Sequence, residues 1–269
     1  MFQFIPLRCR YLAVCLIAVQ VFTLFISSKA FSQGSRGNLD LPTLLPPDEY
    51  GDVVIDRFSG EKKIMPVLFS HRLHRVKYTC RVCHGELDFS MKASDTGVVC
   101  GGGEMTGKYC TICHDNKTAF GPKGTDGEKN CRRCHSADES PDWKKYAELK
   151  QKLPPALYGD EINWAKALTD GLIRPKKSLR SDFKPVILDR TLTLRAEMSG
   201  IPPAVFPHKI HSEWLDCDIC HPDIFNIKKK TTKHFSMWRI LNKEFCGVCH
   251  LSVAFPMNEC ERCHPAMTR

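Results

Sequence analysis

The chain lacks the common motifs of enzyme active sites. Its 269 residues contain no catalytic triad, no glycine-rich phosphate loop and no paired-carboxylate motif. They also contain no aromatic-basic motif of a nucleic-acid-binding module. The sequence therefore offers no direct sign of hydrolysis, phosphoryl transfer or nucleic-acid recognition. What it has in excess is cysteine and histidine, with 15 and 11 residues.

Twelve of the cysteines form six copies of Cys-x-x-Cys-His, the attachment sequence of a c-type haem. Two thiols three positions apart lie on one face of a helical turn and can bond the haem vinyl groups, while the histidine reaches the iron. Structural zinc also uses Cys-x-x-Cys pairs, but zinc gives no reason for a histidine after every pair. We predict six covalently bound haem c groups, at Cys80/Cys83/His84, Cys110/Cys113/His114, Cys131/Cys134/His135, Cys217/Cys220/His221, Cys246/Cys249/His250 and Cys260/Cys263/His264.

The N-terminus has the pattern of an exported protein. Arg8 and Arg10 precede an apolar run over residues 11–26, and small residues follow the run. Cleavage after Ala30 or Ser32 agrees with this pattern, and an uncleaved membrane anchor is the alternative. Export is consistent with c-type haem, which bacteria attach outside the cytoplasmic membrane. We expect a signal peptide at residues 1–32 and a periplasmic location, with the outer surface or the extracellular space as the alternative.

The formal charge of +9 does not by itself indicate a nucleic-acid partner. Loss of the leader removes three basic residues and no acidic one, which leaves +6. Six haems would add twelve propionates, partly offset in the oxidised state by one net positive charge per ferric haem. The oxidised holoprotein would then be near neutral, and we expect no nucleic-acid binding.

The chain contains a long internal repeat. The sequence FSHRLHRVKYTCRVCH at residues 69–84 recurs as FPHKIHSEWLDCDICH at residues 206–221, and two further haem motifs follow each copy. We divide the chain into an N-terminal extension at 33–50, a triheme domain at 51–140, a connector at 141–199 and a second triheme domain at 200–269.

The connector has the composition of a structured segment rather than a flexible linker. Helix formers over residues 142–153 end at two prolines, and a second helix is expected over 161–170, closed by Gly171. Residues 186–195 resemble a short strand, and residues 51–58 and 65–69 could pair as a hairpin. Trp143 and Trp164 could cover haem faces, but ordinary apolar packing is the favoured role.

About forty residues per haem are too few for a conventional core around each cofactor. We therefore predict a haem-cored multihaem cytochrome c with short α-helices, long irregular segments, a minor β-hairpin and little sheet. Without haem the chain should not fold.

Five histidines lie outside the attachment motifs, and four of them recur as His-x-x-His ahead of a haem motif in both repeats. Phe-x-His-x-x-His followed by three attachment motifs resembles the class III cytochromes c of the triheme, c-seven type, here in tandem duplication as in secreted cytochromes of metal-reducing bacteria. The resemblance implies closely spaced bis-histidine haems that pass electrons between partner proteins. It assigns the distal ligands by position: His71 to the Cys80/Cys83 haem, His74 to Cys110/Cys113, His208 to Cys217/Cys220, His211 to Cys246/Cys249 and His234 to Cys260/Cys263.

The haem at Cys131 and Cys134 is left without a histidine as sixth ligand. Residues 85–109 contain no histidine, and the remaining candidates are Cys100, Met91 and Met105. A five-coordinate iron is the other alternative.

These observations lead to an exported hexahaem electron carrier, and not an enzyme, as the favoured function. Its partners would be a membrane oxidoreductase and a terminal acceptor system, with membrane contact only if the N-terminal segment stays uncleaved. One alternative is a multihaem reductase that uses an open haem at Cys131/Cys134, and another is an oligomeric role as a subunit of a haem conduit or filament.

Overall fold

The computed structural model describes residues 41–93, 95–96, 108–122, 127–136, 143–197, 200–227 and 232–267. The predicted signal peptide and residues 33–40 of the predicted N-terminal extension lie outside these ranges. By their contacts, residues 41–269 form one unit that includes both triheme regions and the connector. The boundaries drawn between these three parts stay a prediction. None of the helices in the described ranges has the length and apolar character needed to span a bilayer.

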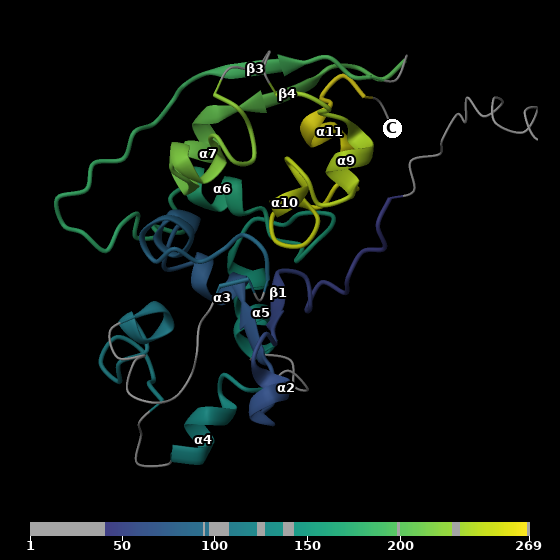
Figure 1. Cartoon of the computed structure of the whole chain (residues 1–269). Coiled ribbons are helices and arrows are strands. Elements are labelled where there is room, and N and C mark those ends of the chain that lie inside the picture. The colour runs from purple at the N-terminus through teal and green to yellow at the C-terminus, as the bar shows by residue number, and fades with distance from the viewer. Residues whose placement is uncertain are drawn as a thin grey trace, which may run out of the picture. The chain divides into compact units, whose positions relative to one another are not determined.

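The first triheme region consists of short elements joined by irregular segments (Figure 1). Pairing is antiparallel between β1 and β2, from Asp52 opposite Ser70 to Ile55 opposite Val67, as predicted for this hairpin. The His-x-x-His segment begins directly at the end of β2 and forms α3. The elements are β1 (Asp52–Ile55), α2 (Ser59–Lys62), β2 (Val67–Ser70), α3 (His71–Arg75), the π-helical turn η1 (Val82–Glu86), the 3-10 turn η2 (Tyr109–Ile112) and α4 (Gly127–Arg132).

The second triheme region repeats this strand-to-helix step. Strand β4 leads directly into α7, which carries the second His-x-x-His segment. Its antiparallel partner, β3, comes from the predicted connector, so the repeated structure includes residues before position 200. The elements are β3 (Thr191–Leu194), β4 (Ala204–Pro207), α7 (His208–Trp214), α8 (Cys217–Cys220), α9 (Met237–Leu241), α10 (Gly247–His250) and α11 (Cys260–Cys263).

The connector folds as the sequence predicted. Its first helix, α5 (Trp143–Lys152), ends before Pro154, and its second, α6 (Trp164–Thr169), begins at an N-cap. There the Asn163 side chain accepts a hydrogen bond of 3.0 Å from the backbone N–H of Lys166. Gly171 follows α6 with φ +70°, the left-handed conformation that closes helices and that glycine adopts without strain.

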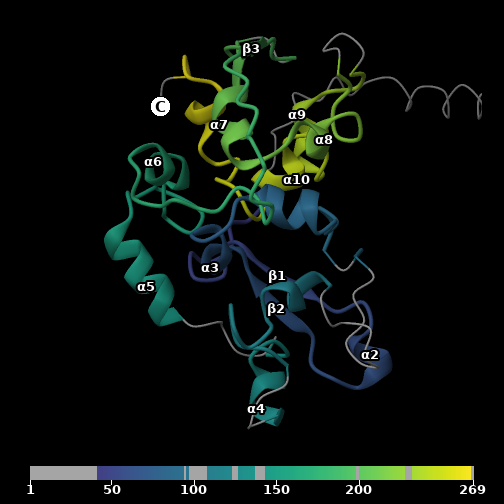
Figure 2. The ribbon, with the colours of Figure 1, turned by 90° about the vertical axis from the view of Figure 1, so that its left-hand side faces the viewer.

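A cluster of buried apolar side chains lies in this connector. It contacts both triheme regions, because Val76 of the first and Trp214 of the second pack against it. Trp164 is buried in this core, whereas Trp143 is 63% exposed. In Figure 2, α5 and α6 of the connector lie at the left of the view. The cluster consists of Tyr146, Leu153, Ile162, Trp164, Ala167 and Ile173.

Candidate haem-binding sites

Each attachment motif lies in or at a short helical turn. In five of the six motifs the histidine N–H donates a hydrogen bond of 2.8–3.0 Å to the carbonyl of the first cysteine, four positions earlier. One turn of this kind brings both thiols to the same side of the chain, which is what two thioether bonds to one porphyrin require. The five histidines are His114, His135, His221, His250 and His264.

Ten of the eleven histidines share a second feature. In each of them Nδ1 lies 2.6–3.1 Å from a backbone carbonyl oxygen, to which it can donate only when that nitrogen carries the proton. This tautomer leaves Nε2 bare and orients the ring, the arrangement found for histidines that bind metals. The ten are His71, His74, His84, His114, His135, His208, His211, His221, His250 and His264.

Three pairs of histidine rings face each other at nearly equal separations. The centres of the His71 and His84 rings are 6.4 Å apart with planes only 6° from parallel. The same separation is 6.2 Å for His74 and His114 and 6.3 Å for His211 and His250. Two nitrogen–metal bonds of about 2 Å, with each ring centre about 1 Å behind its nitrogen, give about 6 Å. The side chains present therefore fit a haem iron between two imidazoles, and the three pairs are those that the sequence assigned.

Burial favours the neutral form of five of these six histidines. It lowers the pKa of His71 to about 3, with help from the Arg75 charge, and the pKa of His250 to about 4. The pKa values of His74, His84 and His211 are lowered as well, mainly for the same reason. A neutral imidazole with a bare Nε2 is the form that binds iron.

One phenylalanine in each repeat positions both histidines of the His-x-x-His segment. Phe69 contacts His71 edge-on, with ring centres 4.8 Å apart, and stacks on His74 at 4.4 Å. Phe206 does the same to His208 and His211, at 4.8 and 4.3 Å. The sequence signal was present, because this phenylalanine has the same spacing in both repeats, but its role follows only from the geometry.

Cys113, the second cysteine of the second motif, lies beside the Tyr78 hydroxyl. Its Sγ lies 3.8 Å from the hydroxyl oxygen of Tyr78, to which the thiol donates a weak hydrogen bond. Burial, followed by this contact with Cys113, raises the pKa of Tyr78, so the phenol keeps its proton. The predicted thioether has no proton to donate and is only a weak acceptor, so attachment at Cys113 requires the Tyr78 hydroxyl to become the donor of this contact. The thioether at Cys113 stays a prediction.

Comparisons with known proteins agree with this geometry. The sequence model of the family described as cytochrome c7 and related cytochrome c matches residues 67–136 and 204–265. The two triheme regions of the chain are therefore of the cytochrome c7 type. Each of the two matches covers one His-x-x-His segment and the three haem motifs after it, which is the tandem arrangement inferred from the repeat.

Solved multihaem cytochromes are among the similar structures. The C-terminal hexahaem fragment of GSU1996 is 24% identical and is matched over 82% of this cytochrome and 99% of the fragment, with a TM-score of 0.25. The N-terminal hexahaem fragment is 24% identical over 81% and 99%, with a TM-score of 0.24. The dodecahaem cytochrome c GSU1996 is 23% identical, and the match covers 75% of this cytochrome and 45% of that chain, with a TM-score of 0.25. None of the curated proteins compared with the chain matches it.

The remaining ligand predictions of the cytochrome concern His208, His234 and the haem at Cys131 and Cys134. His208 has the carbonyl contact and phenylalanine neighbour described above, while His234 is exposed and has φ +58°. Both assignments stay predictions. The Nδ1 atom of His135, the residue after Cys134, lies 2.7 Å from the carbonyl oxygen of Met65. The sequence did not suggest this contact.

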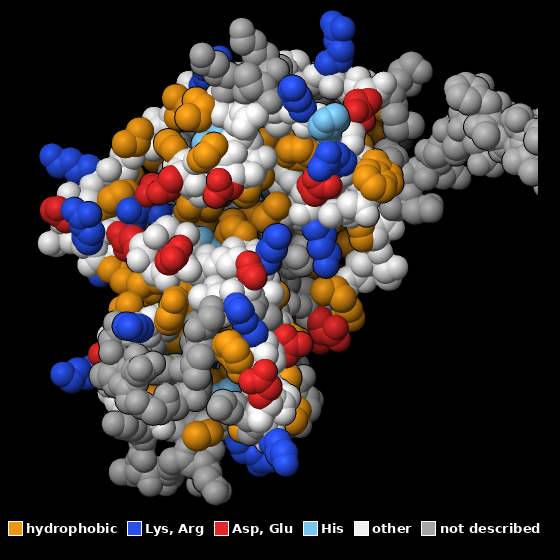
Figure 3. Space-filling view, viewed as in Figure 1, with side chains coloured by type: hydrophobic (Ala, Val, Ile, Leu, Met, Phe, Trp, Pro, Cys, Tyr) orange, Lys and Arg blue, Asp and Glu red, His pale blue; other side chains and the backbone are white. Residues whose placement is uncertain are grey.

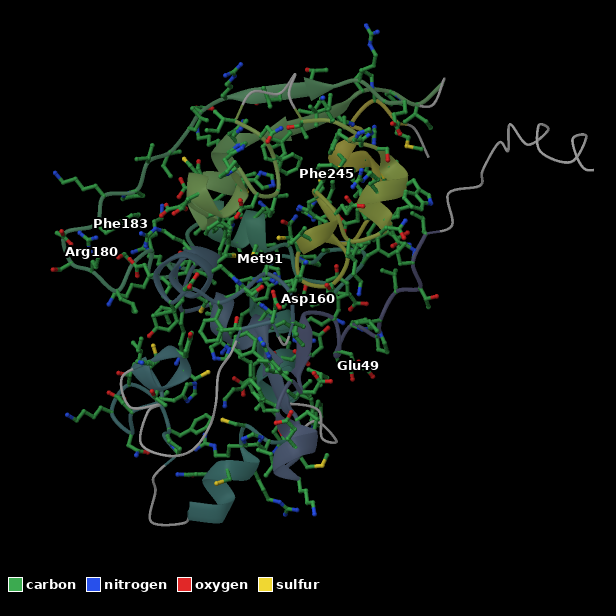
Figure 4. All side chains as sticks on the ribbon, viewed as in Figure 1. Glu49, Met91, Asp160, Arg180, Phe183 and Phe245 are labelled. Carbon is green, nitrogen blue, oxygen red and sulfur yellow. The ribbon has the colours of Figure 1, made fainter. Side chains whose placement is uncertain are left out.

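The three candidate sixth ligands for that haem are only partly described. Cys100 and Met105 lie outside the described residues. Met91 is half-buried, and Figure 4 places it apart from α4, the helix that carries Cys131. The sixth ligand of this haem stays a prediction.

Cysteines of different motifs lie near one another in the cytochrome. Burial raises the pKa of Cys249 to about 12, and the nearby thiols of Cys80 and Cys220 contribute to the increase. Burial likewise raises the pKa of Cys83 to about 12, with contributions from Cys80 and from both cysteines of the second motif. The thiol of Cys80, from the first region, is therefore close to that of Cys249, from the second.

Proposed function

We propose that this cytochrome is an exported hexahaem electron carrier that accepts electrons from one redox protein and passes them to another. The observation that supports this best is the set of three facing histidine pairs at 6.2–6.4 Å, each next to an attachment motif. Haem c, when bound, supplies one-electron redox chemistry. The chain provides two thioether-forming cysteines and one histidine per haem, and a second histidine for up to five of the six.

The role of the protein side chains is to fix the haems and tune them. Carbonyl contacts at Nδ1 hold the tautomer and the ring plane, and phenylalanine contacts hold the His-x-x-His rings. Histidine on both faces of an iron leaves no position for a substrate, which favours electron transfer over catalysis. One face of the cytochrome shows basic and acidic side chains interspersed around apolar ones (Figure 3), which supports protein partners rather than nucleic acid.

Intact mass and redox spectroscopy of the matured protein test this proposal. We expect the mass of the polypeptide plus six haems, and a visible spectrum that changes fully and reversibly between the oxidised and reduced forms. The signal peptide should be absent from the measured mass. Bare polypeptide, or fewer than six haems in fully matured protein, would contradict the proposal.

The histidine count also supports a test of the enzyme alternative. Eleven histidines cannot give two ligands to six irons, and the Cys131/Cys134 haem is the one without an assigned partner. Carbon monoxide should be added to the reduced protein at high dilution, where no ligand comes from a second chain. Binding to one haem would support a reductase with an open iron, whereas no binding would leave the carrier function as proposed.

A further inference from the structure

The two triheme regions meet at a contact between two haem-attachment turns. Turn η1, which holds Cys83 and His84, packs against helix α8 of the second region. The residue after His84 is Gly85, and a methyl group at its Cα would lie 3.6 Å from Cδ1 of Ile219. Ile219 is one of the two residues between the cysteines of the Cys217/Cys220 motif. The two motifs therefore face each other directly.

Arg81, between Cys80 and Cys83, connects the two turns. Its Nε donates to the carboxylate of Asp216, the residue before Cys217, and its Nη1 donates to Glu86 at 2.6 Å. Only 12% of the Arg81 side chain and 12% of the Glu86 side chain are exposed, against 32% for Asp216. A charged network that is this far removed from solvent is stronger and more directional than a surface ion pair.

The connector covers the same network. Glu86 accepts hydrogen bonds from the Ser178 hydroxyl and, at 2.7 Å, from the backbone N–H of Leu179. The guanidinium of Arg81 lies 3.7 Å from the centre of the Phe183 ring. Figure 4 shows Phe183 on the segment that runs along the left-hand side of the view. Residues of the first region, the second region and the connector therefore all stabilise the contact between the two attachment turns.

A second arginine ties the segment before Cys80 to another motif of the second region. Arg75 donates from Nη2 to the carbonyl oxygen of Val253 at 2.7 Å, three residues after His250. It also lies 4.9 Å from the centre of the Trp164 ring in the connector core.

The other two motifs of the first region contact their own region. His114 bonds to the Phe120 carbonyl and His135 to that of Met65, while the Arg133 guanidinium lies 3.5 Å from the centre of the Phe120 ring. Figures 1 and 2 agree in placing α4 at the end of the unit away from α7 and α11. The first motif is therefore the part of this region that faces the second.

We propose that Arg81, Glu86 and Asp216 are positioning residues that hold the Cys80/Cys83 attachment turn against the Cys217/Cys220 turn, and that the two triheme regions exchange electrons at this contact. The inference rests on the proposed electron-carrier function. Each transfer moves one electron from a reduced haem of one region to an oxidised haem of the other, so one is oxidised and one reduced with no bond made or broken. Electrons would thus enter the second region from the first motif of the first region rather than from its last.

A structure of the haem-loaded protein gives the first test. The shortest iron–iron separation between the regions should involve the Cys80/Cys83 haem, with the Cys217/Cys220 or Cys246/Cys249 haem as its partner. A shortest separation that involves the Cys110/Cys113 or Cys131/Cys134 haem would overturn the inference. A protein that holds no redox-active haem would overturn the proposed function, and the inference with it.

Variants test the role of the network. Arg81→Gln, and Asp216→Asn as a milder second variant, should keep six haems by mass and the wild-type spin states by absorption. Electron exchange between haem methyl resonances of the two regions, measured by exchange NMR at partial reduction, should become several-fold slower. Arg180→Gln is the control, because Arg180 and its partner Asp182 are 69% and 70% exposed. If exchange between the regions is equally fast in the wild-type protein and in all three variants, the positioning role is overturned.

Discussion

Among single residues, Arg72 has the most unusual surroundings. It lies between the two histidines of the first His-x-x-His segment, and its side chain is 1% exposed. It donates hydrogen bonds of 2.6–3.0 Å to the carbonyl oxygens of Pro47, Asp48 and Tyr50 and to the Asp52 carboxylate. Its guanidinium also lies 4.8 Å from the centre of the Tyr146 ring. The residue therefore joins the N-terminal segment and the connector to the helix that carries two predicted iron ligands.

The repeat supplies a matched control for Arg72. Lys209 has the same position in the second His-x-x-His segment but forms an exposed ion pair with Asp189. We expect Arg72→Met to lower the free energy of unfolding by about 3–5 kcal/mol, because Asp52 is left buried without its partner. Lys209→Met should cost less than about 1 kcal/mol. Guanidinium unfolding of the two holoproteins measures the difference, and equal losses would contradict it.

His211 tests the distal-ligand assignment. Its ring faces that of His250 with centres 6.3 Å apart, so His211→Ala should leave the Cys246/Cys249 iron without its sixth ligand. We expect one haem to become high-spin while all six remain attached, because attachment depends on the cysteines. Absorption and electron paramagnetic resonance report the spin state, and intact mass reports the haem count. A variant in which no further haem becomes high-spin, relative to the wild-type protein, would show that the assignment is wrong.

The cysteines and histidines could be read from the sequence because the chemistry of attachment fixes their type and spacing. The residues between the cysteines could not, because the motif allows any side chain there. Arg81 and Ile219 are such residues, and both contribute to the contact between the regions. Gly247 is a third, since a methyl group at its Cα would clash with the carbonyl oxygen of Ile240. Tertiary contacts decide these positions, and no local pattern records them.

At the level of elements, the hairpin before the first region and both connector helices agree with the sequence because their signals are local. Alternating apolar residues, the proline stop after α5 and the glycine after α6 each act within a few residues. The pairing of β3 with β4 could not be read in this way. Only residues 191–194 of the expected strand pair, and their partner strand lies in the second region.

Two glycines of the connector allow the cost of backbone strain to be measured apart from the cost of a close contact. Gly159 and Gly171 both have φ +70°, so an alanine at either position should cost about 1–2 kcal/mol. A methyl group at Gly171 would meet no atom within 4 Å, whereas at Gly159 it would lie 3.1 Å from both Pro256 Cδ and Tyr50 Cε1. Gly159→Ala should therefore lower the free energy of unfolding by a further ~1–3 kcal/mol. Thermal unfolding of the two variants checks this, and an equal decrease would mean that the contact relaxes freely.

At the scale of the whole molecule, the distribution of buried side chains agrees with a fold organised around haem. Six of the ten buried hydrophobic residues among those described belong to the connector core. In the two triheme regions many residues around the motifs are only half-buried in the protein alone. The small number of residues per predicted haem, about forty, allowed this feature to be predicted. The place of the conventional core, between the two regions, could not be, because it depends on contacts with Val76 and Trp214.

Removal of haem should therefore unfold the two triheme regions. Their helices have four to seven residues, and isolated helices shorter than about 12–15 residues are marginal in water. Without porphyrin, little apolar surface is left to hold them, while the buried histidine pairs would face each other with no metal between them. We expect apoprotein produced without haem attachment to show little helical circular dichroism and rapid proteolysis within residues 51–136 and 200–267. The holoprotein with the same leader removed is the control. A cooperative thermal transition in the apoprotein, with protection comparable to that of the holoprotein, would show that the polypeptide core suffices.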